Sequence, residues 1–298
     1  MSEPTARDVG EFGLIAAVTA RLPQSGAVLL GPGDDAAVIA VPDGRVVATT
    51  DVLVEGVHFR RDWSTAYDVG RKAAAANLAD VAAMGGTATA LLVGLACPPD
   101  LPLRWALGLA DGLRDEAARV GAVIVGGDTV TAGQIVIAVT ALGSLVGAPV
   151  TRSGAQPGDC VVLTGRPGLS AAGLRQLQQG IREGPLVDAH RRPDPPYAQG
   201  PALARAGATA MCDVSDGLVA DLGHLARASG VGFDLSSELL ADPDVSLQDV
   251  LTGGEDHALV ATVPGPVPPG CRLIGHVIAG SEVLVDGRPV VGGWEHFS

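Results

Sequence analysis

Aspartate, serine and threonine side chains recur in short glycine-rich clusters that are far apart in the sequence. The clusters occupy residues 33–35, 49–51, 77–80, 126–128 and 213–217, and most follow an apolar run typical of a strand. If the fold brings them together, two carboxylates about 4 Å apart repel by roughly 4 kcal/mol at an effective dielectric constant of about 20. Divalent cations relieve such repulsion, and oxygen ligands select Mg²⁺ or Ca²⁺. The clusters therefore predict a multi-metal site, most often one that holds a nucleoside triphosphate.

The two clusters at 126–128 and 213–217 have simpler structural explanations as well. Gly126 and Gly127 are typical of a turn that lets the backbone approach a ligand, and Asp128 after them could bind a metal. Residues 213–217 connect a strand to a helix, so Ser215 could be its N-cap and the aspartates could complement the helix dipole. The aspartates could equally be metal ligands.

Familiar nucleotide motifs are absent. Gly31-x-Gly33-x-x-Ala36 matches a dinucleotide fingerprint, but strand-like residues 38–41 follow it where a helix is required. There is no Walker A loop and no protein-kinase motif set, and Lys72 is the single lysine. Phosphate charge would therefore be neutralised by Mg²⁺ and arginine. Arg152, in a turn-rich segment, is either a surface residue or a phosphate clamp.

Three further positions have side chains suited to contact a substrate. His58 follows the 49–51 cluster, although a lone histidine beside apolar residues is more often structural. Trp294, near the end of the chain, could stack on an aromatic ring. The loop 252–256 ends in Glu255 and Asp256, and we interpret these carboxylates as facing a substrate, possibly a cationic one.

Composition limits the class of protein. The chain has 298 residues, 47% of them apolar and 3% aromatic, with a net charge of −13. A chain of this length is enough for one large or two ordinary domains. Its net negative charge argues against nucleic acid or anionic membranes as partners. No secretory signal, C-x-x-C pair or apolar run of 18 residues is present, which predicts a cytoplasmic protein with free cysteines.

The periodicity predicts alternating helices and strands in two domains, residues 1–148 and 149–298. Helices are expected at 11–22, 66–84, 102–119, 169–178, 217–229 and near 247–251. Strands are expected at 88–96, 121–125, 134–143, 160–164, 209–214, 231–236, 257–263 and 271–278, with a hairpin at 36–41 and 45–50 and a proline-rich loop at 184–200. Asn77 and Asp80 would share one helix face. Acidic residues at strand ends in both halves suit a site between similar domains.

The ordered set of motifs resembles the thiamine-monophosphate kinases, of the aminoimidazole-ribonucleotide-synthetase-like superfamily. The resemblance runs from about Glu11 to Phe297, and any one motif alone is a weak signal. Its pieces are Gly-Asp-Asp at 33–35, Thr-Thr-Asp-Val-Leu-Val-Glu-Gly-Val-His-Phe at 49–59, Asn-Leu-Ala-Asp at 77–80, Gly-Gly-Asp-Thr at 126–129, Arg-Ser-Gly-Ala at 152–155, Asp-Val-Ser-Asp-Gly-Leu at 213–218 and Leu-Thr-Gly-Gly-Glu-Asp at 251–256.

The resemblance implies a two-domain α/β (α+β) fold and a homodimer in which N-terminal sheets pair into a barrel. The N-terminal domain would bind ATP and Mg²⁺ and dimerise, and the C-terminal domain would close the cleft. By this analogy several Mg²⁺ ions are held by Asp34, Asp35, Thr49, Thr50, Asp51, Asp80, Asp128, Asp213 and Asp216. The nucleotide would be contacted by Gly126, Gly127, Asp128, Arg152 and Ser215, and thiamine monophosphate by His58, Glu255 and Trp294. Asp128, Asp216 and Arg152 would serve catalysis.

The expected reaction is in-line transfer of a phosphoryl group from ATP to thiamine monophosphate. The acceptor phosphate is already anionic, so no general base is required. The chain departs from the family pattern at Pro32, Ala79 and His257, and its loops near 180–200 and 240–250 look short, which concerns the shape of the substrate pocket. Two alternatives stay open: another ATP-dependent synthetase of the superfamily, or a non-catalytic protein that binds Mg²⁺ and nucleotide. A reactive cysteine before Cys97 or after Cys271, which two superfamily members need, is absent.

Overall fold

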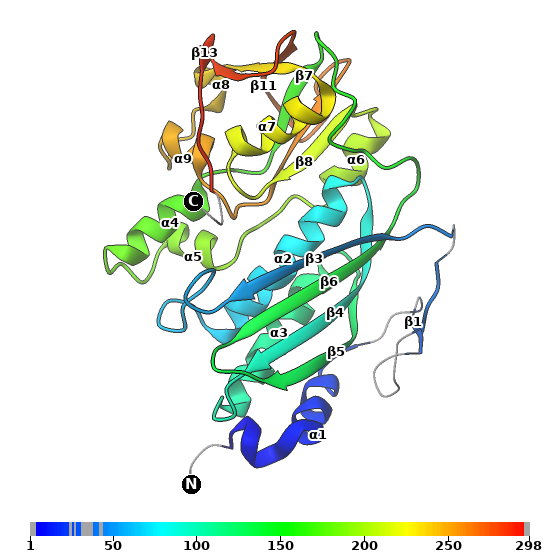
Figure 1. Cartoon of the computed structure of the whole chain (residues 1–298), viewed down its shortest axis with the longest axis vertical. Helices are drawn as coiled ribbons and strands as arrows, with labels where there is room; N and C mark the ends of the chain where they lie inside the picture. Colours follow the sequence, from blue (N-terminus) through cyan, green and yellow to red (C-terminus); the bar gives the residue numbers. More distant parts are fainter. Residues whose placement is uncertain (1–3, 24–25, 27, 31–37, 42–43, 295–298) are drawn as a thin grey trace. The chain divides into compact units, whose positions relative to one another are not determined.

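The structure, a computed structural model, describes residues 4–23, 26, 28–30, 38–41 and 44–294 (Figure 1). They form two compact units. The described residues of 1–81 and 87–144 form the first unit, and those of 82–86 and 145–298 form the second. The mixed α/β fold in two parts agrees with the expected fold class. Within the described ranges, no helix is long and apolar enough to cross a membrane.

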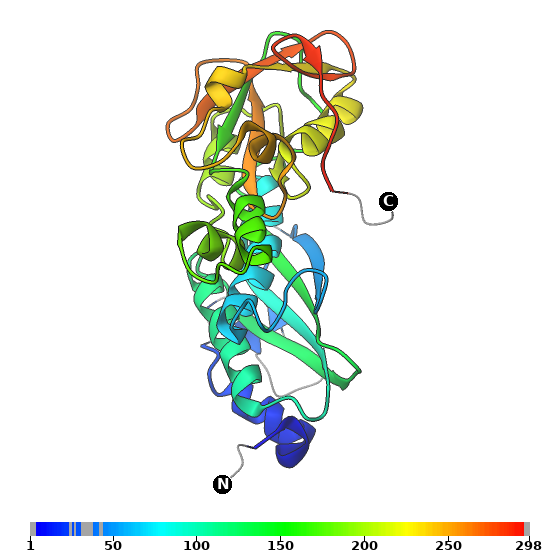
Figure 2. The ribbon, with the colours of Figure 1, turned by 90° about the vertical axis from the view of Figure 1, so that its left-hand side faces the viewer.

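The first unit is built on a four-stranded sheet in the order β3-β6-β4-β5. The strands are β3 (Val47–Val54), β6 (Val136–Ser144), β4 (Thr87–Cys97) and β5 (Val123–Thr131), and only the β4–β5 pair is parallel. Helices α2 (Ala66–Ala83) and α3 (Leu103–Ala118) cover one face of this sheet, as Figures 1 and 2 show. The unit also contains α1 (Ala6–Thr19) and a small sheet of β1 (Val28–Leu30) and β2 (Val38–Ile39).

Small residues let α2 and α3 pack with their backbones in contact. A Cβ atom added to Gly70 would lie 2.2 Å from the carbonyl oxygen of Leu109, and one added to Gly112 would lie 2.1 Å from that of Tyr67. Many of the other buried residues of α2 are alanines. Close packing of small side chains explains how the unit forms a core with few aromatic residues.

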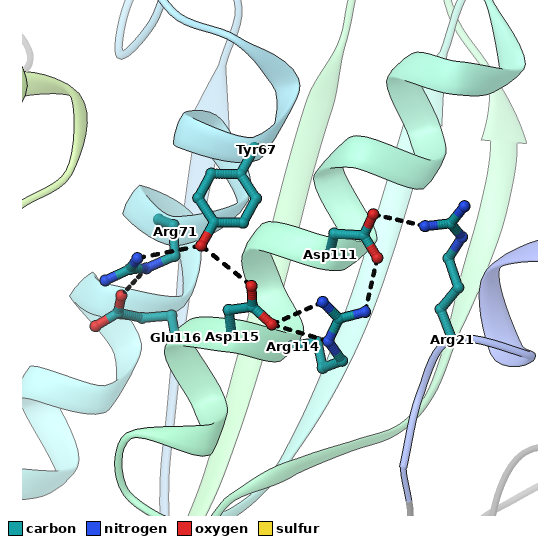
Figure 3. Close-up of polar contacts among 7 residues, drawn as sticks. All are labelled: Arg21, Tyr67, Arg71, Asp111, Arg114, Asp115 and Glu116. Carbon is teal, nitrogen blue, oxygen red and sulfur yellow. Dashed lines mark hydrogen bonds and ion pairs between the residues drawn. The ribbon is translucent and has the colours of Figure 1, made fainter.

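Charged side chains also join these two helices (Figure 3). Glu116 on α3 is fully buried and accepts hydrogen bonds from Arg71 on α2 and from Arg119. Tyr67 donates to Asp115 at 3.1 Å, and Arg114 lies between Asp111 and Asp115. The helices are therefore linked by an ion-pair network as well as by backbone packing.

The second unit is built on a seven-stranded sheet in the order β13-β12-β9-β11-β7-β10-β8. The main core lies between this sheet and α7 (Leu218–Ser229), and its largest fully buried side chain is Phe233. The strands are β7 (Cys160–Thr164), β8 (Ala210–Val214), β9 (Gly232–Leu235), β10 (Ala258–Val263), β11 (Arg272–Ile278), β12 (Val283–Val285) and β13 (Arg288–Pro289). The other helices are α4 (Leu169–Gln178), α5 (Pro185–Arg191), α6 (Gln199–Arg205), α8 (Ser237–Leu240) and α9 (Leu247–Thr252).

Most expected elements are confirmed, and α4 begins and ends at the predicted residues. Three expectations are wrong. Residues 126–128 lie inside β5 and not in a turn, and the 184–200 loop contains α5. In the described part of the expected 36–41/45–50 hairpin, β2 pairs with β1 and β3 pairs with β6. The two errors that involve strands concern long-range pairing, which local periodicity does not encode, whereas α5 is a short helix inside a proline-rich segment.

Candidate functional site

In the first unit, oxygen-bearing side chains gather between β3 and α2. The Thr49 hydroxyl donates to the Asp80 carboxylate at 2.6 Å, and the Asp51 amide donates to the Asn77 side-chain oxygen at 3.1 Å. Thr49 and Asp51 are two residues apart on β3, so their side chains lie on the same face of the sheet. This is the face that α2 covers. Asn77 and Asp80 do share a helix face, as their spacing predicts. This set of hydroxyl and carboxylate oxygens has the ligand chemistry that Mg²⁺ prefers.

Thr50 and Asp128 lie on the opposite face of the same sheet. Thr50 is paired with Thr140, whose hydroxyl donates to it at 3.1 Å. Asp128 on β5 pairs with Gly94 on β4, and Gly94 pairs with Ala138 on β6, which in turn pairs with Val52 on β3. Paired residues point to the same side of a sheet, so Asp128 lies on the same face as Val52. The exposed carboxylate accepts the Thr129 amide at 2.8 Å. The residues assigned to metals in this unit are therefore divided between two faces.

The sheet also separates Asp51 and Asp128 laterally. β3 and β5 are the two edges of the sheet, so three strand spacings lie between them. At about 4.8 Å per spacing this is roughly 14 Å. One Mg²⁺ ion, whose ligands lie about 2.1 Å away, cannot contact both carboxylates of the same chain.

Gly127 has a structural role that differs from the expected one. A Cβ atom there would lie 1.9 Å from the carbonyl oxygen of Val93, so glycine is required for close packing of β5 on β4. A β-bulge lies beside it, where Leu91 pairs with Ile124 but Leu92 pairs with Gly126. Bulges of this kind change the direction of the side chains that follow, here that of Asp128.

In the second unit, the loop after β8 carries Asp213, Ser215 and Asp216. Asp213 is buried, and its carboxylate lies 3.0 Å from Nδ1 of His257. Ser215 is not the N-cap of α7, because that position is Gly217, which has a φ of 119°. The loop is instead held by Asp221, which accepts the amides of Asp216 and Gly217, each at 3.1 Å. Burial, together with the nearby Asp213 charge, raises the pKa of Asp221 to about 7.

The two carboxylates of the acidic loop between α9 and β10, those of Glu255 and Asp256, lie in different environments. Asp256 is buried and accepts the amides of Gly168 at 2.6 Å and Ser170 at 2.8 Å, at the N-terminus of α4. Burial raises its pKa to about 7, against the lowering effect of these two hydrogen bonds. The expectation that both carboxylates face a substrate is therefore wrong for Asp256. The Glu255 side chain is 34% exposed, and the residue has an unusual positive φ of 66°.

The C-terminal segment returns to the loop after β8 in the same unit. The Trp294 amide donates to the carbonyl oxygen of Asp216 at 2.9 Å, and the side chain is 59% exposed. The Glu255 amide in turn donates to the Ser215 carbonyl oxygen at 2.8 Å. The second unit thus brings together Ser215, Asp216, Glu255 and Trp294, from three segments that are far apart in the sequence.

The remaining expected residues are placed as follows. His58 accepts the Val54 amide at Nδ1 (3.0 Å), and Arg152 is exposed, with its carbonyl oxygen bound by the Ser229 hydroxyl. Asp34 and Asp35 lie outside the described residues. Within the part of the chain that the structure describes, no group of three or more His, Cys, Asp or Glu side chains is spaced to hold a metal ion. Ser170, His190 and Asp221 border the site but are not among the residues expected from the sequence. Only Asp221 could have been found from the sequence, because it lies four residues after Gly217 and so on the same side of the first helical turn.

Comparison with known proteins identifies the family. Residues 33–145 match the AIR synthase related protein N-terminal domain, and residues 156–267 match the C-terminal domain. A thiamine-monophosphate kinase from Mycobacterium tuberculosis is 50% identical over 311 residues, which cover 99% of this chain and 93% of the relative.

Two solved structures are similar along most of their length. The thiamine-monophosphate kinase of Stenotrophomonas maltophilia K279a has a TM-score of 0.79 and 32% identity, and covers 93% of this chain and 95% of its own. The structure of AaThiL complexed with AMPPCP and TMP has a TM-score of 0.79 and 31% identity, and covers 98% of each chain. The chain therefore belongs to the thiamine-monophosphate kinase family of the AIR synthase related proteins.

Proposed function

We infer that this chain transfers a phosphoryl group from ATP to thiamine monophosphate, producing ADP and thiamine diphosphate. The observation that carries this inference is the 50% identity to a thiamine-monophosphate kinase along 99% of the chain. The similarity to a structure complexed with AMPPCP and TMP supports the pairing of these two substrates. Direct in-line transfer fits a chain whose clustered groups are carboxylates and hydroxyls.

We further propose that the ATP is bound together with several Mg²⁺ ions. The oxygen-rich sets fit such ions, because Thr49, Asp51 and Asp80 lie together in one unit and Asp213 and Asp216 in the other. When bound, Mg²⁺ would offset the charge of the phosphates. The proposed ligands are Asp34, Asp35, Thr49, Thr50, Asp51, Asp80, Asp128, Asp213 and Asp216.

The remaining site residues are proposed to bind and orient the two substrates. Arg152, Gly126, Gly127 and Ser215 would contact the nucleotide. His58, Glu255 and Trp294 would contact thiamine monophosphate, whose thiazolium ring is cationic. A half-exposed carboxylate and an exposed indole in the same unit suit a cationic aromatic ligand. No residue needs to act as a general base, since the accepting phosphate oxygen is already charged.

A homodimer is part of this proposal, and the sheet of the first unit supports it. The face opposite α2 exposes Val52, Leu92 and Val130, which a second copy would cover. Because about 14 Å separate Asp51 and Asp128 in one chain, a metal that used both would take them from different copies. Residues 1–148 would bind ATP and dimerise, and residues 149–298 would close the substrate site.

Mixed dimers test this arrangement directly. Asp51→Asn and Asp128→Asn chains, each inactive alone, should regain part of the activity when they are mixed, because one site per dimer would be intact. Analytical ultracentrifugation should give a dimer at micromolar concentration, and a monomer there would contradict the proposal.

Turnover distinguishes the proposed function from its alternatives. ADP release and thiamine diphosphate should be measured with ATP and Mg²⁺, with and without thiamine monophosphate. We expect equal amounts of both products, and only when the acceptor is present. A non-catalytic protein would release no ADP, whereas another ATP-dependent synthetase would not form thiamine diphosphate.

A further inference from the structure

Two buried polar residues border the Glu255 carboxylate. The Ser170 hydroxyl lies 3.0 Å from Nδ1 of His190, and the same nitrogen lies 3.8 Å from Oε2 of Glu255. Ser170 is 1% exposed and His190 is 5% exposed, whereas the Glu255 side chain is 34% exposed. The three side chains therefore lead from the interior of the second unit to its surface.

The position of His190 is fixed by close contact between two helices. A Cβ atom on Gly173 of α4 would lie 2.0 Å from the carbonyl oxygen of Leu186 on α5, so the helices touch through their backbones. Ser170 is on α4 and His190 is on α5, and the hydrogen bond between them fixes the imidazole ring. The amide of Ser170 is also bound by Asp256, the neighbour of Glu255. Helix packing and the acidic loop are thus joined at Ser170.

The backbone of Glu255 is fixed on its other side. Its amide donates to the Ser215 carbonyl oxygen at 2.8 Å, and a Cβ atom on Gly254 would lie 2.3 Å from the same oxygen. Glu255 itself has a left-handed backbone conformation, with a φ of 66°. With the backbone held, the remaining freedom of Glu255 is rotation of its side chain, and His190 lies where it can restrict that rotation.

We propose that His190, oriented by Ser170, is a positioning residue that holds the Glu255 carboxylate in the orientation that binds the cationic part of the acceptor. This proposal rests on the proposed function and adds a determinant of acceptor affinity. A carboxylate that is oriented in advance loses less conformational freedom when the ligand binds. His190 itself does not touch the substrate.

Steady-state kinetics of His190→Asn test the proposal, because asparagine shortens the side chain but keeps a polar group. We expect the KM for thiamine monophosphate to rise about fivefold. The kcat and the KM for ATP should stay within about twofold of wild type, because only the ground-state orientation of one acceptor contact is lost. Ser170→Ala should raise the same KM less, since the ring then keeps its place but loses one hydrogen bond.

Asp188→Asn is the matched control on the same helix. Its side chain is 50% exposed and pairs with Arg192 at 3.3 Å, so the KM for thiamine monophosphate should not change. If this variant has the same effect as His190→Asn, the effect comes from general disturbance of α5 and the proposal is wrong.

A double-mutant cycle with Glu255→Gln separates positioning from packing. In that background, His190→Asn should raise the KM no further, because the charged group that it orients is gone. The same KM increase in both backgrounds, or an unchanged KM with Glu255 intact, would overturn the proposal. A wild-type protein without any thiamine diphosphate formation would instead refute the proposed function.

Discussion

The Thr49 hydroxyl donates a 2.6 Å hydrogen bond to the Asp80 carboxylate and so joins strand β3 to helix α2 across 31 positions of sequence. The bond holds one oxygen of Asp80 beside the strand that also carries Asp51. Two of the proposed metal ligands are therefore oriented before any ligand binds. Orientation of this kind reduces the free-energy cost of assembling a metal site.

Replacing Thr49 by valine tests this relationship. Thr49→Val keeps the shape of the side chain and suits a strand, so we expect the melting temperature to change little. The loss of the hydroxyl should lower kcat/KM for ATP by about tenfold, because Asp80 loses a partner that orients it. Thr49→Ser, which restores the hydroxyl, should recover most of the activity; a fully active Thr49→Val would contradict the assignment.

Asp128→Asn should remove most activity and leave the fold intact. The side chain is exposed and its carboxylate accepts the amide of the neighbouring Thr129, so the free energy of unfolding should change by no more than about 0.5 kcal/mol. The loss should appear in kcat. Asp100→Asn, also exposed and in the same unit, removes the same charge and should keep normal turnover. Near-normal turnover of Asp128→Asn would exclude Asp128 from the metal site.

Mg²⁺ and ATP should stabilise the protein together more than either does alone. Without metal, the clustered carboxylates repel the nucleotide. A ligand at 100 times its Kd adds about 2.7 kcal/mol to the free energy of unfolding, and thermal-shift measurements can detect this. Equal stabilisation by ATP in excess EDTA would show that nucleotide binding does not need the proposed ions.

The stability contributed by Asp256 should depend on pH. Its folded pKa of about 7 lies above its usual value of 3.8, because burial disfavours the charged form. The folded state therefore binds the proton more tightly than the unfolded state, and the contribution is fully present below pH 3.8. It is lost as pH rises toward 7, with a slope of at most about 1.4 kcal/mol per pH unit.

Urea denaturation of Asp256→Asn between pH 5 and 8 measures this effect. Asparagine cannot titrate, so the variant should gain stability relative to wild type as pH rises, and the difference should level off above pH 7. Asp221, whose pKa is also raised to about 7, keeps its own contribution in both proteins and does not affect the comparison. Parallel curves for the two proteins would mean that Asp256 is already charged at pH 5.

Glu116→Gln should destabilise the first unit. Glu116 is fully buried and pairs with Arg71 (Figure 3) and with Arg119, so its neutralisation removes the negative charge that both partly buried guanidinium groups contact. We expect a loss of about 2–3 kcal/mol in calorimetry or denaturant unfolding. The control is Asp62→Asn, which neutralises the exposed pair of Asp62 with Arg60 and should cost less than about 0.5 kcal/mol.

Local patterns in the sequence were sufficient for the regular elements and for the family. The apolar period defined α4 at 169–178, and the i,i+3 spacing placed Asn77 and Asp80 on one helix face. The order of the acidic motifs identified the thiamine-monophosphate kinase family. These signals lie within a few residues of one another or in the motif order, so no knowledge of distant contacts was needed.

Only the tertiary structure decided which carboxylates can act together. Strand order places Asp51 and Asp128 at opposite edges of one sheet, although both looked like members of a single cluster. Glu255 and Asp256 are adjacent, yet one is half-exposed beside His190 and the other is buried at the N-terminus of α4. Strand pairing and burial arise from contacts between residues far apart in the chain, and those contacts leave no periodic trace in the local sequence.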